Sequence, residues 1–215
     1  MEMEIGRDMI WLGQSGFHIR AGGKHIFIDP FRIREQKERA DLLLITHAHH
    51  DHYDPESMRK VLKPGTVIIA SGLCKGIESF GKVTIAKPGF SKEVLGFGIE
   101  AIPAYNIMES RLGFHPRRND WLGYVLDIGG ERIYHAGDTD FTPEMRDLKD
   151  LDIALIPIGG TYTMDVEEGI AAANEIDAKR VAPIHYRMLL GEGASDAEKR
   201  FKDRVGNSLI LTEGE

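Results

Sequence analysis

The second half of the chain repeats the order of elements found in the first half. Residues 16–29 and residues 123–138 share one pattern, in which two strand-like segments flank a Gly-Gly pair and an aspartate closes the run. Paired glycines supply the positive φ angles of a tight hairpin. This ordered repetition predicts two similar halves, each a small mixed sheet with helices, packed sheet against sheet. Further apolar strands follow in each half, over 41–46 and 66–71 and again over 152–157 and 180–185.

The remaining elements fit one domain over residues 1–215. The 215 residues are enough to bury a core, and 42% hydrophobic with 28% charged residues is a globular composition. Hydrophobic periodicity and turn residues predict the elements of this domain. The expected strands are 9–12, 17–21, 24–28, 42–46, 67–70, 83–86 and 99–103, and the expected helices are 55–62, 166–176 and 196–205, the last capped by Ser195.

Charge and cysteine content limit the classes of partner and compartment. The net charge is −7, which does not favour nucleic acid as a partner. Cys74 is the single cysteine, and we expect a buried thiol, with a reactive thiol as the alternative, in a reducing cytoplasm. The first residues lack the pattern of a signal peptide, and no run of ~20 apolar residues predicts a membrane span. We expect a small-molecule substrate and no membrane partner, and a homo-oligomer is left open.

Four side chains that can bind a metal follow the apolar strand at 42–46. They are His47, His49, Asp51 and His52, and four of the nine histidines lie between positions 47 and 52. A loop at the end of a buried strand can direct several side chains to one point. Imidazole with carboxylate favours Zn, Mn or Fe over Ca or Mg. Gathering these groups without an ion would cost desolvation, so we interpret the run as a metal site rather than a histidine-rich surface loop.

The run from Thr46 to His52 resembles the signature of the metallo-β-lactamase superfamily, and the resemblance extends from Trp11 to Tyr186. Residues 156–164 resemble the compact branch of metal-dependent hydrolases related to ascorbate-phosphate lactonase-like proteins. The resemblance implies an α+β fold, a four-layer αββα sandwich of two mixed β-sheets with the metals at one edge, in agreement with the internal pseudo-duplication. The other motifs that carry it are Asp29-Pro30-Phe31, Tyr134-His135-Ala136-Gly137-Asp138-Thr139 and Pro183-Ile184-His185-Tyr186.

The resemblance also implies two divalent metal ions, with Zn preferred and Mn or Fe as alternatives. Asp29 would hold the ligand loop by hydrogen bonds rather than touch a metal. The implied ligands are His47 and His49 for the first metal, Asp51, His52 and His185 for the second, and Asp138 as the bridge between them.

The chain departs from the family pattern at the third histidine of the first metal. In the family this histidine follows a Pro-small-residue pair, whereas residues 102–106 are Ile-Pro-Ala-Tyr-Asn. We predict that His115, in the loop that follows, supplies the missing nitrogen. The alternatives are that Asn106 or water takes the place, or that His115 is an exposed loop residue. Nearby arginines could attract an anionic substrate or form a solvated basic loop; they are Arg111, Arg117 and Arg118.

The predicted chemistry is hydrolysis of a small ester, lactone or phosphoester. Two adjacent cations lower the pKa of a bridging water, and the hydroxide attacks carbon or phosphorus. Asp51 would orient the hydroxide while binding the second metal. Candidates for protonating the leaving group are Tyr162, His135 and Tyr186, although a supporting role is preferred for His135. Structural or supporting roles are also expected for His18, His25 and His50.

Three other functions are open. One is a nuclease of the same superfamily, which the short chain and the acidic balance disfavour. Another is a mononuclear or dinuclear iron redox enzyme; diiron redox members of the superfamily usually carry a glutamate where His49 stands. The last is a metal-binding protein without turnover.

Overall fold

The computed structural model describes Glu4 and residues 7–214, which form two compact units. The first unit contains the chain up to Lys87 and again from Thr212 onward. The second unit is Pro88–Leu211. The prediction of a single domain over residues 1–215 stays a prediction. Among the described residues, no helix is long and apolar enough to cross a bilayer.

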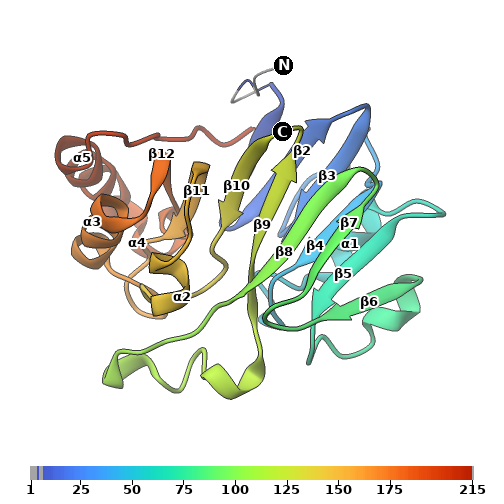
Figure 1. Ribbon diagram of the computed structural model, residues 1–215, viewed down its shortest axis with the longest axis horizontal. Coiled ribbons are helices and arrows are strands. Elements are labelled where there is room, and N and C mark those ends of the chain that lie inside the picture. The colour runs from blue at the N-terminus through green and yellow to red at the C-terminus, as the bar shows by residue number, and fades with distance from the viewer. Residues whose placement is uncertain (1–3, 5–6, 215) are drawn as a thin grey trace. The chain divides into compact units, whose positions relative to one another are not determined.

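The first unit is built on a six-stranded mixed sheet in the order β1-β2-β3-β4-β5-β6. The strands β1 to β3 pair antiparallel, and β3 to β6 pair parallel (Figure 1). Its elements are β1 (Met9–Gly13), β2 (Gly16–Ala21), β3 (Lys24–Ile28), β4 (Leu42–Ile45), α1 (Pro55–Val61), β5 (Val67–Ser71), the 3-10 turn Ile77–Phe80 and β6 (Val83–Ala86).

The second unit carries a second six-stranded mixed sheet, in the order β12-β11-β10-β9-β8-β7. Here β7 to β10 pair antiparallel, and β10 to β12 pair parallel. Helix α3 contacts β11 and α5. The elements are β7 (Ser91–Val94), β8 (Phe97–Pro103), β9 (Leu122–Ile128), β10 (Glu131–His135), α2 (Pro143–Arg146), β11 (Leu151–Pro157), α3 (Val166–Glu175), β12 (Ala178–Ile184), α4 (Arg187–Leu190) and α5 (Ala194–Arg204), with 3-10 turns at Glu109–Arg111, Arg117–Asn119 and Gly191–Gly193.

The predicted duplication is present in the strand pairing. In unit one, β1 to β5 pair antiparallel, antiparallel, parallel and parallel, and β8 to β12 of unit two repeat this series. A helix separates the last two strands in both cases, α1 in the first and α3 in the second. Both hairpins turn on a Gly-Gly pair with positive φ, at 22–23 and at 129–130. Two mixed sheets of six strands with helices match the metallo-β-lactamase αββα fold, and this prediction is confirmed.

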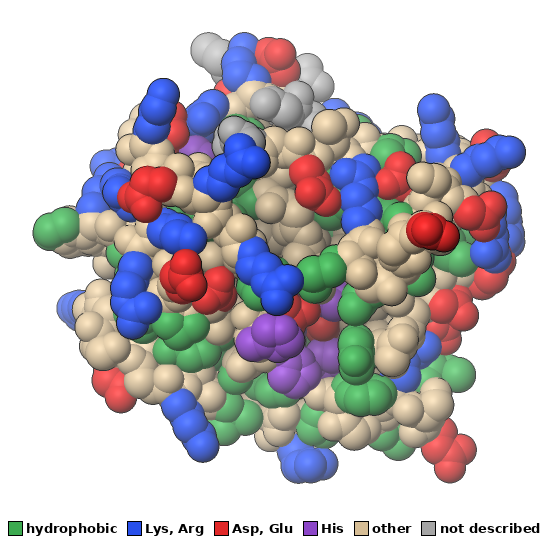
Figure 2. Space-filling model, turned by 180° about the vertical axis from the view of Figure 1, so that it is seen from behind, with side chains coloured by type: hydrophobic (Ala, Val, Ile, Leu, Met, Phe, Trp, Pro, Cys, Tyr) green, Lys and Arg blue, Asp and Glu red, His purple; other side chains and the backbone are tan. Residues whose placement is uncertain are grey.

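Charged side chains of both signs are interspersed on the face of the molecule that Figure 2 shows. Blue and red side chains are mixed over this face, and a group of histidine side chains lies near its centre. On that face no continuous basic stripe of the kind that binds nucleic acid is present.

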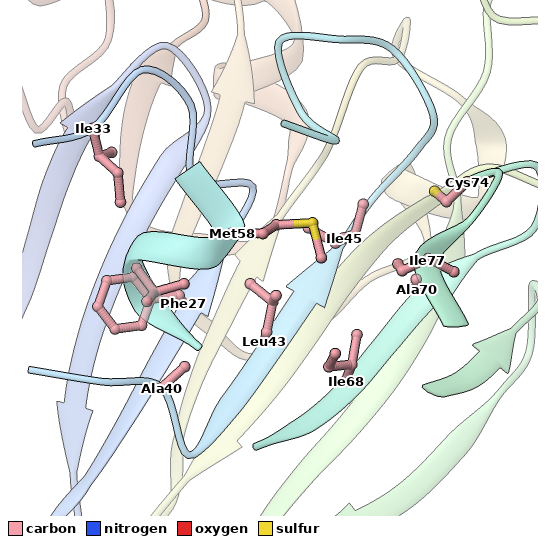
Figure 3. Close-up of a cluster of buried hydrophobic side chains, with 11 residues drawn as sticks. Phe27, Ile33, Ala40, Leu43, Ile45, Met58, Ile68, Ala70, Cys74 and Ile77 are labelled. Atoms are coloured by element: carbon pink, nitrogen blue, oxygen red, sulfur yellow. The ribbon is translucent and has the colours of Figure 1, made fainter. Parts of the chain in front are cut away.

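The core of the first unit lies between α1 and its sheet. Figure 3 shows Leu43, Ile45 and Ile68 from the strands turned toward Met58 of the helix, and all four are fully buried. Each such side chain contributes about 1.5–3 kcal/mol by leaving water. Cys74 belongs to this cluster, and burial raises the pKa of its thiol to about 12. We therefore interpret Cys74 as a packing residue.

Short polar side chains cap the starts of α1 and α3, whereas the cap predicted for the last helix is corrected. Asp54 accepts a hydrogen bond from the Glu56 amide at the start of α1, with Pro55 in the first turn. Asp165 and Glu168 form a capping box at the start of α3. Ser195 was predicted to cap the last helix, and this was wrong. Helix α5 begins at Ala194, its cap position is Gly193, and a preceding 3-10 turn leads directly into it.

Candidate metal centre

The candidate metal ligands of the first unit lie in the turn that follows β4. His47 and His52 are buried, and Asp51 has 15% of its side chain exposed. The Nε2 atom of His47 lies 3.1 Å from Nδ1 of His49, and Nε2 of His52 lies 3.8 Å from Oδ2 of Asp51. These atoms are close enough to one another to bind a small cation, and the division of this loop between two ions stays a prediction.

A hydroxyl and a carboxylate hold the far side of two of these rings. Asp29 is fully buried and accepts hydrogen bonds from the Thr46 amide (2.8 Å) and from the Thr46 hydroxyl. Its Oδ2 atom lies 2.8 Å from Nδ1 of His52. Since the Thr46 hydroxyl donates to Asp29, it accepts from Nδ1 of His47 at 3.0 Å. Both Nδ1 atoms are thereby assigned the proton, and each Nε2 presents a lone pair to the site.

Gln14 contacts a candidate metal ligand, and sequence reasoning did not single it out. Its side-chain amide donates to Oδ2 of Asp51 at 2.9 Å, across 37 positions of the chain. Gln14 is buried and has a positive φ of 48°, a conformation that is costly for a residue other than glycine and is found preferentially at functional sites. The signal was present in the resemblance that begins at Trp11, but nothing in the sequence pointed from Gln14 to Asp51.

The candidate metal ligands of the second unit come together at one carboxylate oxygen, Oδ2 of Asp138. Asp138 follows β10, His185 follows β12, and His115 lies in the long connection between β8 and β9. The Oδ2 atom of Asp138 lies 3.2 Å from Nε2 of His115 and 3.4 Å from Nε2 of His185. All three residues are buried. One carboxylate oxygen flanked by two imidazole nitrogens is the arrangement expected of a bridging ligand.

Within the second unit, the ring of His115 is held with its Nε2 atom toward Asp138. Its Nδ1 atom lies 3.1 Å from Oδ1 of Asn106 and 3.2 Å from the carbonyl of Tyr162. Both partners are acceptors, so the network assigns the proton to Nδ1. Asn106 itself accepts from the His115 amide and donates to the Tyr162 carbonyl and to Asp140. Its side-chain amide is thus engaged at both ends, as a support for His115.

Asp140 anchors the connection that carries His115, and it was not singled out from the sequence. Its Oδ2 atom accepts from the amides of Ile107 and Met108 at 2.8 and 2.9 Å. Its Oδ1 atom accepts from the side chain of Asn106 and pairs with Arg111 at 2.9 Å. We call these contacts of Asp140 with Asn106, Ile107, Met108 and Arg111 the Asp140 clamp. Asp140 stands two positions after Asp138, so one turn carries a candidate metal ligand and also positions the connection that carries His115.

The three arginines of this connection have different surroundings. Arg111 is buried and forms ion pairs with Asp140 and Glu168, so it is a structural residue rather than part of a solvated loop. Arg117 pairs with Glu144 and stacks on the ring of Tyr105. Arg118 is exposed. Only part of the basic group suggested by the sequence is therefore open to a ligand.

Two of the predicted proton donors, Tyr186 and His135, are engaged in hydrogen bonds within the second unit. The hydroxyl of Tyr186 donates to Glu198 at 2.6 Å, and burial raises its pKa. His135 is fully buried at the end of β10, where its Nδ1 atom accepts from the Gly137 amide at 3.2 Å. Tyr162 is partly exposed, and its ring makes an edge contact with Phe114. Tyr186 is not retained as a proton donor.

The remaining histidines lie outside the donor groups. His18 on β2 stacks on Phe27, and its Nε2 atom lies 3.0 Å from Nδ1 of His25 on β3. His50 has 84% of its side chain exposed and touches the ring of Phe31 edge-on. These surroundings are structural for His18 and His25.

The residues present fit a divalent ion. With Nδ1 of His115 protonated, its Nε2 lone pair faces the Asp138 carboxylate at 3.2 Å, and this arrangement requires a proton or a metal ion at that place. The donors in both units are imidazole and carboxylate, the combination that suits Zn, Mn or Fe.

Comparison with known proteins first defines the class. Residues 8–185 match the family described as the beta-lactamase superfamily domain. A solved structure from Parabacteroides distasonis, described as a metal-dependent hydrolase, is 33% identical with a TM-score of 0.84, covering 96% of this chain and 93% of that one. Igni18, a metallo hydrolase from Ignicoccus hospitalis, is 26% identical with a TM-score of 0.75, covering 96% and 95%.

Curated relatives then narrow the class to one family. A UPF0173 metal-dependent hydrolase of Thermoplasma acidophilum is 32% identical over 222 residues, 95% of each chain. One from Thermococcus onnurineus is 34% identical over 225 residues, covering 95% of this chain and 96% of the relative. The chain belongs to the UPF0173 metal-dependent hydrolase family of the beta-lactamase superfamily. The predicted link to ascorbate-phosphate lactonase-like proteins stays a prediction.

Proposed function

We propose that the chain is a hydrolase that holds two divalent ions with donors from both units and cleaves a small ester, lactone or phosphoester. The observation that carries this proposal is Asp138, whose Oδ2 atom lies within 3.4 Å of two imidazole nitrogens that belong to different proposed ions. The names of the relatives support the reaction class. The proposed ligands are His47, His49 and His115 for the first ion, Asp51, His52 and His185 for the second, and Asp138 between them.

The neighbours of the donors support this assignment. Asp29 and Thr46 hold the rings of His47 and His52 from behind, which favours Asp29 as a support for the loop rather than a ligand. His115 is favoured over Asn106 as the third nitrogen, because the side-chain amide of Asn106 is engaged with Asp140 and with Tyr162.

Bound divalent ions would supply a hydroxide nucleophile near neutral pH by lowering the pKa of water, and zinc suits these donors best, with Mn or Fe as alternatives. Asp51 would orient the nucleophile and accept its proton. Gln14 donates a hydrogen bond to Oδ2 of Asp51 and so orients this carboxylate. The partial exposure of Asp51 gives that proton a way to solvent. A cytoplasmic location and the oligomeric state stay predictions.

The test is a panel of chromogenic phosphodiesters, phosphomonoesters, esters and lactones, assayed with the metal-loaded protein. We expect turnover of at least one class, and a loss of about a hundredfold or more in kcat for Asp51→Ala. Gln14→Leu should lower kcat by a smaller factor with little change in metal content, since it only orients Asp51. Equal inactivity of the wild type and Asp51→Ala across the panel, with metal bound, would remove the support for a hydrolase.

A further inference from the structure

An open pocket of about 520 Å³ lies in the second unit, on the connection that carries His115. Tyr105, Ile107, Leu112 and Pro116 give it an apolar wall, and Arg117 and Arg118 stand at the same pocket. Ile107 and Leu112 each expose 49% of their surface. The volume falls in the range of roughly 300–1,000 Å³ that holds small-molecule ligands. Large apolar side chains that are exposed to solvent near a proposed reaction centre indicate a binding surface.

One guanidinium at this pocket is open to a ligand. Arg117 is held by Glu144 at 2.6 Å and by the face of the Tyr105 ring. Arg118 is exposed and makes no hydrogen bond or ion pair with any residue that the structure describes. An arginine binds a carboxylate or phosphate through two parallel N–H donors. The pocket therefore combines an apolar wall with one available anion-binding group.

A single residue connects this pocket to the proposed metal ligand. Asn106 lines the pocket, and its side chain accepts from the His115 amide at 2.9 Å, while its backbone amide donates to the His115 carbonyl at 2.8 Å. The Asp140 clamp fixes Ile107 and Met108 next to it. Hydrogen bonds thus connect the pocket wall to the His115 residue within one segment, so a ligand in the pocket lies one residue away from a proposed metal ligand.

We propose that this pocket binds the non-reacting part of the substrate, an apolar group that carries a carboxylate or phosphate, with the anion on Arg118. The proposal rests on the proposed hydrolase function and specifies its substrate class, an amphipathic anionic ester or lactone. Ile107 and Leu112 receive the apolar group, and Arg118 receives the charge. Binding energy from such a remote part of a substrate positions the bond to be cleaved.

The experiment measures binding separately from turnover. Isothermal titration uses the full metal-loaded chain with four probes: 4-phenylbutanoate, 3-phenylpropyl phosphate, neutral 4-phenylbutan-1-ol and acetate. Each titration is repeated after removal of metal with EDTA, so that a carboxylate held by an ion is distinguished from one held by Arg118. The variants are Arg118→Ala, Leu112→Ser and, as a matched control, Arg59→Ala, an exposed arginine on α1.

We expect the aromatic anions to bind about tenfold tighter than the alcohol or acetate, with and without metal. Arg118→Ala should weaken the Kd of the anions by about tenfold and leave the alcohol unchanged. Leu112→Ser should weaken all three aromatic probes, and Arg59→Ala should change none beyond about twofold. A preference for the carboxylate over the phosphate probe, or the reverse, shows which anion the pocket binds better.

Two outcomes would overturn the pocket proposal: an alcohol that binds as tightly as the anions, or an Arg118→Ala variant with an unchanged Kd for them. The two proposals fail separately. If the binding pattern holds but the metal-loaded wild type cleaves nothing in the substrate panel, the hydrolase function fails and the pocket stands. If turnover is observed while Arg118→Ala changes neither Kd nor KM for anionic substrates, the pocket proposal fails and the hydrolase function stands.

Discussion

An oxygen atom behind the ring decides which nitrogen each of three buried histidines presents. For His47 this is the Thr46 hydroxyl, for His52 the Asp29 carboxylate and for His115 the Tyr162 carbonyl. In each case the oxygen accepts a hydrogen bond from the Nδ1–H group, which leaves Nε2 as the proposed ligand atom. These partners hold the rings in place before a metal binds, which lowers the entropy that binding must overcome.

Asp29→Asn tests this support directly. An asparagine amide cannot accept from both Thr46 and His52 as the carboxylate does, so the ring of His52 loses its orientation. We expect metal affinity to fall by about 10- to 100-fold, measured by competition with a chelating indicator. Asp127→Asn, at an exposed position of β9, should leave the affinity unchanged. An affinity of Asp29→Asn equal to that of the wild type would show that the loop does not depend on this carboxylate.

The buried side chain of His18 should make the folded protein less stable in acid. Burial, with smaller effects of Arg20 and His25, lowers the pKa of His18 from 6.5 to about 4. Between pH 6.5 and pH 4, His18 is therefore protonated in the unfolded chain and neutral in the folded chain. The stabilisation that the neutral imidazole provides is complete above pH 6.5 and is lost as the pH falls toward 4. Of the free energy of unfolding, about 2 kcal/mol should disappear between pH 7 and pH 5 through this residue.

The measurement is urea unfolding at pH 7 and pH 5 with metal removed from every sample. His18→Gln should reduce the difference between the two pH values by about 2 kcal/mol. His50→Gln, at an exposed position, should retain the wild-type difference. The same pH dependence in His18→Gln as in the wild type would place the acid sensitivity in other groups.

The candidate ligands that lie close together in the sequence were predictable, and so was Asp29 as a support of their loop, whereas Gln14 and Asp140 were not. The run from His47 to His52 contains its own evidence, because three imidazoles and one carboxylate crowded into six positions have no stability rationale. Gln14 and Asp140 contact their partners across 37 and 33 positions. A glutamine or aspartate at such a distance has no local pattern, so only the folded chain shows the contact. His115 was proposed because the family pattern left a gap that it could fill, and its role as a ligand stays a prediction.

At the scale of elements, the connection between β8 and β9 depends on one turn after β10. Asp140→Asn retains the size of the side chain but removes the charge that pairs with Arg111 and weakens the acceptor for Ile107 and Met108. We expect the free energy of unfolding to fall by about 2–3 kcal/mol. Trypsin should cut at the arginines of this connection faster than in the wild type.

The control for this prediction is Asp147→Asn, an exposed aspartate after α2. It should change neither the stability nor the trypsin pattern. If Asp140→Asn kept wild-type resistance at these arginines, the clamp would not be what orders the connection.

The turn after β11 packs closely against the end of β12. A Cβ atom at Gly159 would collide with the carbonyl of His185 and the side chain of Leu189. Since His185 already has a positive φ of 56°, its backbone has little freedom to move away. Gly159→Ala should lower the free energy of unfolding by about 1–3 kcal/mol and lower metal affinity, as measured by denaturation and by indicator competition.

Gly72→Ala is the matched substitution, because a Cβ atom at this position would meet nothing within 4 Å and the φ of Gly72 is not positive. It should stay within about 0.5 kcal/mol of the wild type. Full metal affinity in Gly159→Ala would contradict the idea that this close contact positions His185.

Strand prediction succeeded where a pattern was strong. The Gly-Gly hairpins and the apolar strands β4 and β11 follow from turn chemistry and hydrophobicity. The missed strand β7 has the sequence Ser-Lys-Glu-Val, with three exposed residues and one of intermediate exposure. It forms by pairing with β8 rather than by burying a face, so no hydrophobic alternation marks it. The start of α5 was misplaced because a 3-10 turn precedes it instead of a cap.

For the whole molecule, the duplication provides a donor-bearing sheet in each unit. The donors of unit one follow β4, and two of those of unit two follow β10 and β12. Neither set alone has the ligands for two ions, since unit one lacks the proposed bridge and unit two has a single carboxylate among its proposed ligands. The proposal therefore requires both halves of the duplicated chain for one reaction, although each half repeats the strand pairing of the other.

Metal content per folded chain, measured by inductively coupled plasma mass spectrometry after gel filtration, tests this requirement most directly. The wild type should hold about two divalent ions per chain, and Asp138→Ala should lose at least one of them together with hydrolysis. A wild type that holds no more than one ion at saturation, or a folded Asp138→Ala variant that still holds two, would contradict a dinuclear centre bridged by Asp138.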